Sequence, residues 1–97
     1  MKKSEILEKL EAHYAELQAR GVRSVALFGS AARDEVTDTS DVDLLVDFER
    51  PTGLLELIRL KHRLEEMLRV EKVDLLTRDG LHPALKERIL AEAIHVL

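Results

Sequence analysis

An alternation of polar and apolar residues across 41–48 restricts the fold of this 97-residue chain more than any other feature. One parity carries Val42, Leu44, Val46 and Phe48. The other carries Asp41, Asp43, Leu45 and Asp47. A period of two is typical of a β-strand, whose successive side chains point to opposite faces of a sheet. We therefore predict a strand with one face in an apolar core and an acidic opposite face.

Three other segments have helical spacing. Ser4 to Arg20 repeats apolar residues every three or four positions, with Ser4 as the expected cap and Gly21 as the end. Leu54 to Arg69 carries a broader leucine-rich stripe, which we expect to be core rather than a partner groove. A last helix begins at His82-Pro83 and includes Ile94 on its apolar side, since proline suits the first helical turn.

Two strands and a short helical turn complete the predicted order. Val22 to Phe28 and Val70 to Leu76 are short apolar segments, as buried strands are. Ser30 to Glu35 is expected to form one helical turn, and Val36 to Ser40 a loop. This succession predicts a single α/β (α+β) domain over 1–97, in the order α-β-α-β-α-β-α, with helices packed on a small mixed three-stranded sheet.

Composition excludes several classes of function. The chain has 19 acidic against 15 basic residues, a net charge of −4, so no general attraction to nucleic acid or to anionic membranes is expected. It contains no cysteine, which excludes disulfides and thiolate metal sites. No apolar run is long enough to cross a bilayer, and the N-terminus does not read as a signal peptide. We expect a cytoplasmic protein.

The junction at Gly29-Ser30 is a candidate phosphate site. A strand that turns into a helix leaves backbone N–H groups free, and these can hold an anion. Gly29 allows close approach because it has no side chain, and Ser30 adds a hydroxyl donor. Arg33, one turn later, carries a planar guanidinium suited to phosphate oxygens.

Three aspartates are candidate metal ligands. Asp41 and Asp43 share one strand face, roughly 6.5–7 Å apart by the rise per residue, and carboxylates of this kind hold Mg²⁺ beside substrate phosphates. Asp74 lies between apolar neighbours in a short strand, where a charge is costly without a cation or a mobile proton. Taken singly, these features also fit a helix cap, a solvated strand face and an exposed edge residue; together they favour a site.

The segments Leu27-Phe28-Gly29-Ser30-x-x-Arg33 and Ser40-Asp41-Val42-Asp43-Leu44-Leu45-Val46 resemble the signature of the DNA polymerase beta nucleotidyltransferase superfamily. In its minimal members the catalytic domain stands alone. The core of the resemblance covers about 22–76 of this chain. One departure is Asp34-Glu35, where family members often carry a small residue after the arginine; two added carboxylates put the phosphate geometry in question.

The resemblance implies a role for each matching residue. Gly29 and Ser30 would grip a nucleoside triphosphate, Asp41 and Asp43 would bind two Mg²⁺ ions, and Asp74 would complete the carboxylate set and help deprotonate the attacking hydroxyl. The implied reaction transfers a nucleotide, AMP from ATP in the simplest case, to a hydroxyl acceptor and releases pyrophosphate.

The resemblance further implies an antitoxin whose partner is a HEPN-domain toxin and whose acceptor is a tyrosine hydroxyl, with a homo- or hetero-oligomer as the assembly. Two alternatives stay open. The fold could be a non-catalytic binding module that neutralises a partner by complex formation, although such a module has no need of converging carboxylates. It could instead be an antibiotic-type nucleotidyltransferase acting on a small molecule, which the absence of a second, substrate-binding domain disfavours.

Several polar residues are not assigned to the site. Asp47 has the parity of the other acidic residues but lies further along the strand, and we expect it in solvent. Tyr14 is expected to pack in the stripe of the first helix. The four histidines lack the spacing of a zinc site, so structural or exposed positions are expected for His13, His62, His82 and His95.

Overall fold

The structure, a computed structural model, describes residues 2–29, 41–78 and 80–95. The predicted helical turn at 30–35, with Ser30 and Arg33, and the loop at 36–40 lie outside these ranges. The elements in chain order are α1 (Lys3–Ala12), α2 (Tyr14–Ala19), β1 (Val22–Phe28), β2 (Val42–Phe48), α4 (Leu54–Leu68), β3 (Val73–Thr77), α5 (Pro83–Glu92) and β4 (Ile94–His95).

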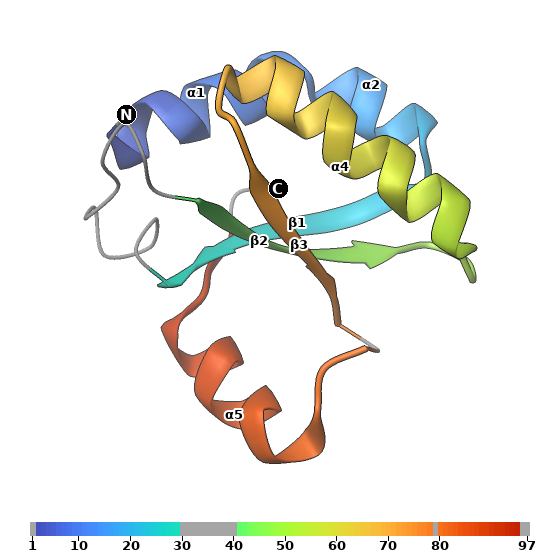
Figure 1. Ribbon diagram of the computed structural model, residues 1–97, viewed down its shortest axis with the longest axis vertical. Coiled ribbons are helices and arrows are strands. Elements are labelled where there is room, and N and C mark those ends of the chain that lie inside the picture. Colours follow the sequence, from blue (N-terminus) through green and yellow to red (C-terminus); the bar gives the residue numbers. More distant parts are fainter. Residues whose placement is uncertain (1, 30–40, 79, 96–97) are drawn as a thin grey trace.

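The three long strands form the predicted mixed sheet, in the order β3-β2-β1-β4 when the short fourth strand is included. β1 and β2 are antiparallel, whereas β2 and β3 are parallel. A parallel pair needs a crossover connection, which α4 supplies. Figure 1 shows α1, α2 and α4 together on one side of the sheet and α5 on the other.

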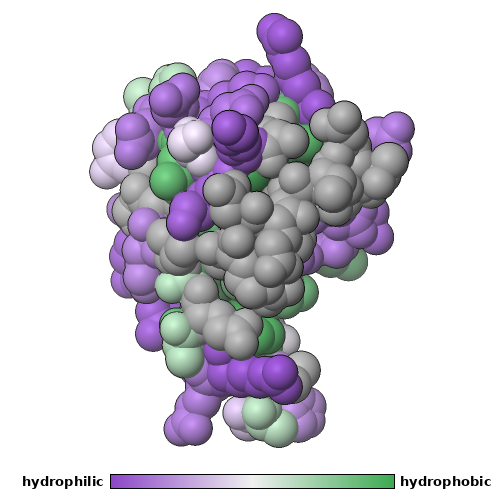
Figure 2. All heavy atoms as spheres, turned by 90° about the vertical axis from the view of Figure 1, so that its left-hand side faces the viewer, coloured by the Kyte–Doolittle hydropathy of each residue, from purple (hydrophilic) through white to green (hydrophobic). Residues whose placement is uncertain are grey.

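The core fills the space between the sheet and the three helices on its upper side. The apolar parity of β2 is buried there as predicted, with Val42 and Leu44 0% exposed. Opposite it, α1 contributes Ile6 and Leu10, and α4 contributes a buried stripe made of Leu60, Leu64, Met67 and Leu68. The upper part of the surface drawn in Figure 2, on the side of the helix layer, is mainly hydrophilic where it is not grey, as an amphipathic helix layer requires.

The start of α4 departs from the prediction that its whole apolar stripe is core. Leu54 is 72% exposed, Leu55 60% and Ile58 42%, so the first turn of the helix carries apolar side chains on the surface. Leu57 of this turn packs partly against the core, and the fully buried residues of α4 begin at Leu60. No described helix has the length and apolarity needed to cross a membrane.

The N-terminal helix differs from the single predicted helix because it breaks at His13. The His13 Nδ1 atom lies 2.8 Å from the Lys9 carbonyl oxygen. The ring therefore occupies the acceptor that the backbone N–H of His13 would use in a continuous helix. The backbone N–H of His13 donates instead to Leu10, at 3.2 Å. The predicted cap was also wrong: Lys2, not Ser4, precedes α1, and its N–H donates to Glu5 Oε1 at 3.3 Å.

Tyr14 was predicted to pack in the apolar stripe, and that prediction was wrong. Its side chain is 45% exposed, and its hydroxyl accepts a hydrogen bond from Gln18 Nε2 at 2.8 Å. The break at His13 begins a new helix at Tyr14, so the periodicity of α1 does not continue through this residue.

The last helix ends earlier than predicted. α5 stops at Glu92, and Ile94–His95 form β4 rather than a further helical turn. In β4, Ile94 pairs with Leu27 and His95 with Ala26. This short strand adds to the predicted three, and it covers backbone groups that β1 would otherwise leave open at the edge of the sheet.

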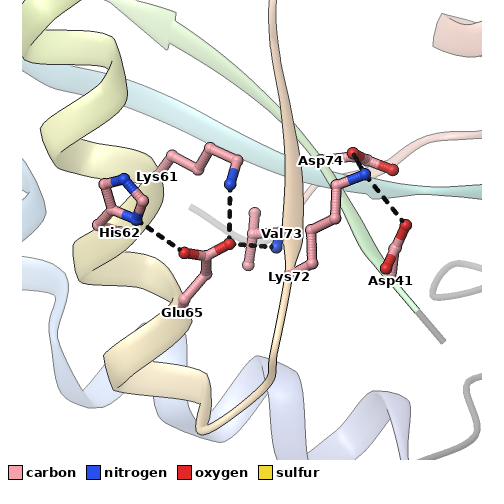
Figure 3. Close-up of polar contacts among 7 residues, drawn as sticks. All are labelled: Asp41, Lys61, His62, Glu65, Lys72, Val73 and Asp74. Atoms are coloured by element: carbon pink, nitrogen blue, oxygen red, sulfur yellow. Dashed lines mark hydrogen bonds and ion pairs between the residues drawn. The ribbon is translucent and has the colours of Figure 1, made fainter. Parts of the chain in front are cut away.

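Glu65 connects α4 to the start of β3 by a hydrogen bond. Its Oε2 accepts hydrogen bonds from the Val73 backbone N–H and from Lys61 Nζ, each at 2.9 Å, and its Oε1 lies 3.0 Å from His62 Nδ1 (Figure 3). Burial raises the pKa of the Glu65 carboxyl, but hydrogen bonds from Lys61, Val73 and His62 outweigh this and leave the pKa lowered.

We predict that Glu65→Ala lowers the free energy of unfolding by about 1.5–3 kcal/mol, because it removes charge-assisted hydrogen bonds and the acceptor of a strand N–H. Urea denaturation measures this. Glu66→Ala is the control, since that side chain is 71% exposed and its ion pair with Arg63 is 3.6 Å long. Equal losses for the two variants would contradict the role of Glu65.

The pH dependence of stability follows from Glu65 and Glu16. Arg63 donates to Glu16 at 2.7 and 2.9 Å, joining α2 to α4, and this hydrogen bond chiefly lowers the Glu16 pKa. Both folded pKa values lie below the ordinary 4.5, so the unfolded chain binds more protons on acidification.

We therefore predict that these two carboxylates contribute fully to the free energy of unfolding above pH 4.5, and that this contribution is lost as the pH falls below it. Urea denaturation from neutral pH down to pH 3 measures this. The free energy of unfolding should fall less steeply with acidification in the Glu16→Gln/Glu65→Gln double variant than in the wild type. An unchanged slope would place the acid sensitivity in other groups.

Candidate functional site

The register of the sheet brings three predicted site residues together. Phe28 of β1 pairs with Asp43 of β2, and Asp43 in turn pairs with Asp74 of β3. Gly29 follows β1 directly, so it lies at the same end of the sheet. Because neighbouring strands are about 4.8 Å apart, the glycine and the two carboxylates are adjacent across three strands.

Two features of the structure require glycine at position 29. Its φ of 62° lies in the left-handed region, which other residues rarely adopt. A Cβ atom built on it would overlap the Asp43 Oδ2 atom and lie 3.2 Å from Cγ. The backbone of Gly29 is therefore packed directly against the Asp43 carboxylate, which leaves no room there for a side chain.

Asp41 and Asp74 are joined by a cation that the sequence analysis did not assign to the site. Lys72 Nζ lies 3.6 Å from Asp41 Oδ2 and 3.4 Å from Asp74 Oδ1 (Figure 3). The hydrogen bond to Asp74, followed by the charges of Asp74 and Asp41, raises the pKa of Lys72. The two carboxylates are partly exposed, with 43% and 41% of their side-chain surfaces accessible.

The backbone sets this arrangement. The Val42 N–H donates to the Lys72 carbonyl at 3.2 Å, and Val42 pairs with Val73 in the parallel ladder. Asp41 and Lys72 therefore lie opposite each other, one residue before their strands begin. Alternation then places Lys72, Asp74 and the two β2 carboxylates on the face away from α1 and α4.

The donor set suits a hard divalent cation. Mg²⁺ prefers carboxylate oxygens, and the Lys72 ammonium already stands as a cation between two of the three aspartates. Within 2–29, 41–78 and 80–95, no three carboxylates or imidazoles converge on one point as they stand. A metal ion would thus need Asp41, Asp43 or Asp74 to turn toward it, which the partial exposure of Asp41 and Asp74 permits.

Asp47 lies at the other end of β2, and its predicted exposure to solvent was wrong. Only 14% of its side-chain surface is accessible, and its Oδ2 accepts hydrogen bonds from Arg23 at 2.6 and 3.1 Å. This pair lines a cleft of about 600 Å³ that also includes Arg50, Thr77 and Arg78. The cleft is beyond the carboxyl ends of β2 and β3, away from the acidic group formed by Asp41, Asp43 and Asp74, so we do not assign it to the site.

Of the other predicted site residues, Ser30 and Arg33 lie outside the described ranges. Two histidines belong to local hydrogen bonds as expected: His62 contacts Glu65, and His82 caps α5 by accepting from Ala84 N–H at 3.1 Å. Sequence reasoning missed Lys72, since nothing but the parallel pairing of β2 with β3 places it beside Asp41.

Comparison with known proteins identifies the family of this chain. The nucleotidyltransferase domain family matches residues 3–96. A candidate protein adenylyltransferase of Methanocaldococcus jannaschii is 52% identical over 81 residues, which cover 84% of this chain and 86% of that relative. The protein adenylyltransferase MntA of Thermococcus cleftensis is 42% identical over 93 residues, covering 95% and 93% of the two chains. The chain therefore belongs to the nucleotidyltransferase domain family and is a nucleotidyltransferase.

Solved structures give the same fold. A candidate minimal nucleotidyltransferase superposes with a TM-score of 0.84 at 41% identity, covering 97% of this chain and 95% of that one. A complex of a tri-AMPylated Shewanella oneidensis HEPN toxin with an MNT antitoxin matches with a TM-score of 0.71 at 16% identity, covering 95% and 71%. The second likeness establishes the fold alone. The predicted polymerase-beta-like nucleotidyltransferase fold is confirmed.

We predict that Gly29→Ala lowers the free energy of unfolding by about 1–2 kcal/mol, through the left-handed backbone and the overlap with Asp43. Asp43→Ala should relieve the overlap but not the backbone strain. A double-variant cycle, followed by urea denaturation, should therefore give a coupling above about 0.5 kcal/mol. Additive losses would show that Gly29 and Asp43 do not contact each other.

Proposed function

We propose that this nucleotidyltransferase is a Mg²⁺-dependent protein adenylyltransferase that moves AMP from ATP to a tyrosine hydroxyl of a HEPN-domain partner, and so acts as its antitoxin. The observation that carries the proposal is the alignment of Gly29, Asp43 and Asp74 across three strands. It puts a side-chain-free backbone corner, suited to phosphate, beside carboxylates suited to metal.

Each residue has a defined task in this proposal. The backbone at Gly29 and Ser30, with Arg33, binds and orients the triphosphate. Asp41 and Asp43 would hold two Mg²⁺ ions, with Asp74 completing the set. When bound, these ions neutralise the phosphate charge and activate the acceptor oxygen.

The bond changes balance within the site. The tyrosine oxygen forms a bond to the α-phosphorus of ATP as the bond from that phosphorus to the bridging oxygen of pyrophosphate breaks. Asp74 accepts the hydroxyl proton, and pyrophosphate leaves with the displaced electron pair. The main work of the protein is positioning and charge stabilisation, as is usual in phosphoryl chemistry.

The similar proteins support a protein acceptor. A folded partner presents its own hydroxyl and can help to close the site. Relatives over nearly the whole chain are named as protein adenylyltransferases, and a chain of the same fold occurs in a complex with an AMPylated HEPN toxin. Both facts support a HEPN partner, and an acceptor delivered by that partner.

We predict that the chain, incubated with Mg²⁺, ATP labelled at the α-phosphate and a HEPN-domain partner, transfers label to a partner tyrosine. Asp41→Asn/Asp43→Asn should reduce labelling to background, because the amides keep the shape but lose the metal-binding charge. Chelation of Mg²⁺ should do the same. Asp47→Asn is the matched control, since Asp47 shares their strand and parity but pairs with Arg23.

Mass spectrometry of the partner identifies the acceptor residue and the transferred nucleotide. Tight binding without transfer, retained by the double variant, would replace the enzyme with a non-catalytic module that neutralises its partner by occupying a surface. Transfer to a small hydroxyl compound but not to the partner would reassign the acceptor and leave the chemistry intact.

A further inference from the structure

The position of Lys72 between Asp41 and Asp74 is built into the sheet. Its Nζ atom is 3.6 Å from one carboxylate and 3.4 Å from the other, and Figure 3 shows the ammonium pointing between them. The Lys72 carbonyl also accepts the Val42 N–H, which ties its backbone to the residue after Asp41. The backbone hydrogen bond therefore keeps Lys72 next to Asp41, so the contact does not depend on the long side chain alone.

We propose, on the basis of the proposed Mg²⁺ site, that Lys72 is the internal counter-ion of the acidic group. Its ammonium neutralises Asp41 and Asp74 before a metal arrives, and a divalent cation displaces it. Metal loading is then the exchange of one cation for another on the same carboxylate oxygens.

Displacement follows from geometry and charge. Mg²⁺ binds carboxylate oxygens at about 2.0–2.1 Å, and an ammonium shared by the same oxygens is both crowded and repelled. Lys72 has 54% of its side-chain surface exposed, so its flexible stem can swing the ammonium into water while the backbone stays in place.

The exchange has a consequence for substrate order. Lys72 Nζ lies between Asp41 and Asp74 and occupies their facing oxygens. An ion that arrives with a nucleoside triphosphate has phosphate oxygens as further ligands. Lys72 competes with the ion for the carboxylate oxygens but not for these phosphate oxygens. Metal and nucleotide therefore load together more readily than metal alone.

The first test measures Mn²⁺ affinity of the full chain without nucleotide, by electron paramagnetic resonance of the free ion. Lys72→Met should bind Mn²⁺ about threefold to tenfold more tightly than the wild type, the range expected on removing two exposed ion pairs. Lys72→Arg should stay near the wild type because it keeps the charge. Lys61→Met is the matched control, since Lys61 pairs at 2.9 Å with Glu65, outside the acidic group.

The second test follows displacement in the unaltered protein, by acylation of lysine amines and mass spectrometry. Mg²⁺ should increase the acylation of Lys72 and leave that of Lys61 unchanged. A constant or reduced acylation of Lys72, or equal or weaker Mn²⁺ binding by Lys72→Met, overturns the exchange while leaving the metal site in place. If neither wild type nor Lys72→Met binds Mn²⁺, with or without ATP, the exchange and the proposed metal-dependent function both fail.

Discussion

The parallel pairing of β3 with β2 is the constraint on which the site depends. It sets Asp74 beside Asp43, and a slip of one residue would turn Asp74 to the opposite face. Because parallel strands cannot be joined by a hairpin, the pairing relies on α4, whose buried leucines fill the core above the sheet. Glu65 then holds the first N–H of β3, so one side chain of the crossover helix fastens the strand that carries Asp74.

The pairing creates an electrostatic problem. Several carboxylates share one face at one end of a small sheet, where they repel each other unless a cation lies among them. Lys72, one residue before the strand that carries Asp74, supplies such a cation, and it does so at a partly exposed position, where a charged group can exchange with solvent or metal. If these carboxylates were fully buried, their ionisation would be costly and a metal ion would reach them slowly.

Much of this arrangement could be predicted from local pattern. Alternation around Val42 and Leu44 identified a half-buried strand, and the glycine after an apolar strand marked a backbone corner. The errors have two physical causes. The His13 ring competes locally for a helical acceptor, whereas the long-range pairing of Ile94 with β1 outweighs its helical periodicity. Periodicity also cannot tell which turns of an apolar helix reach the core, so the exposure of Leu54 was missed.

The sequence by itself determined the period of each main helix and strand, most of the residues of the core and the types of group available for chemistry, since period, parity and residue type are local properties. Only the tertiary structure decided which carboxylates meet, that Gly29 packs against Asp43, that Lys72 bridges Asp41 and Asp74, and that Asp47 pairs with Arg23. Except for the contact of Lys72 with Asp74, these contacts join residues far apart in the chain. They depend on strand order and register, which are set by the packing of the whole sheet against its helices and leave no signal in any single segment.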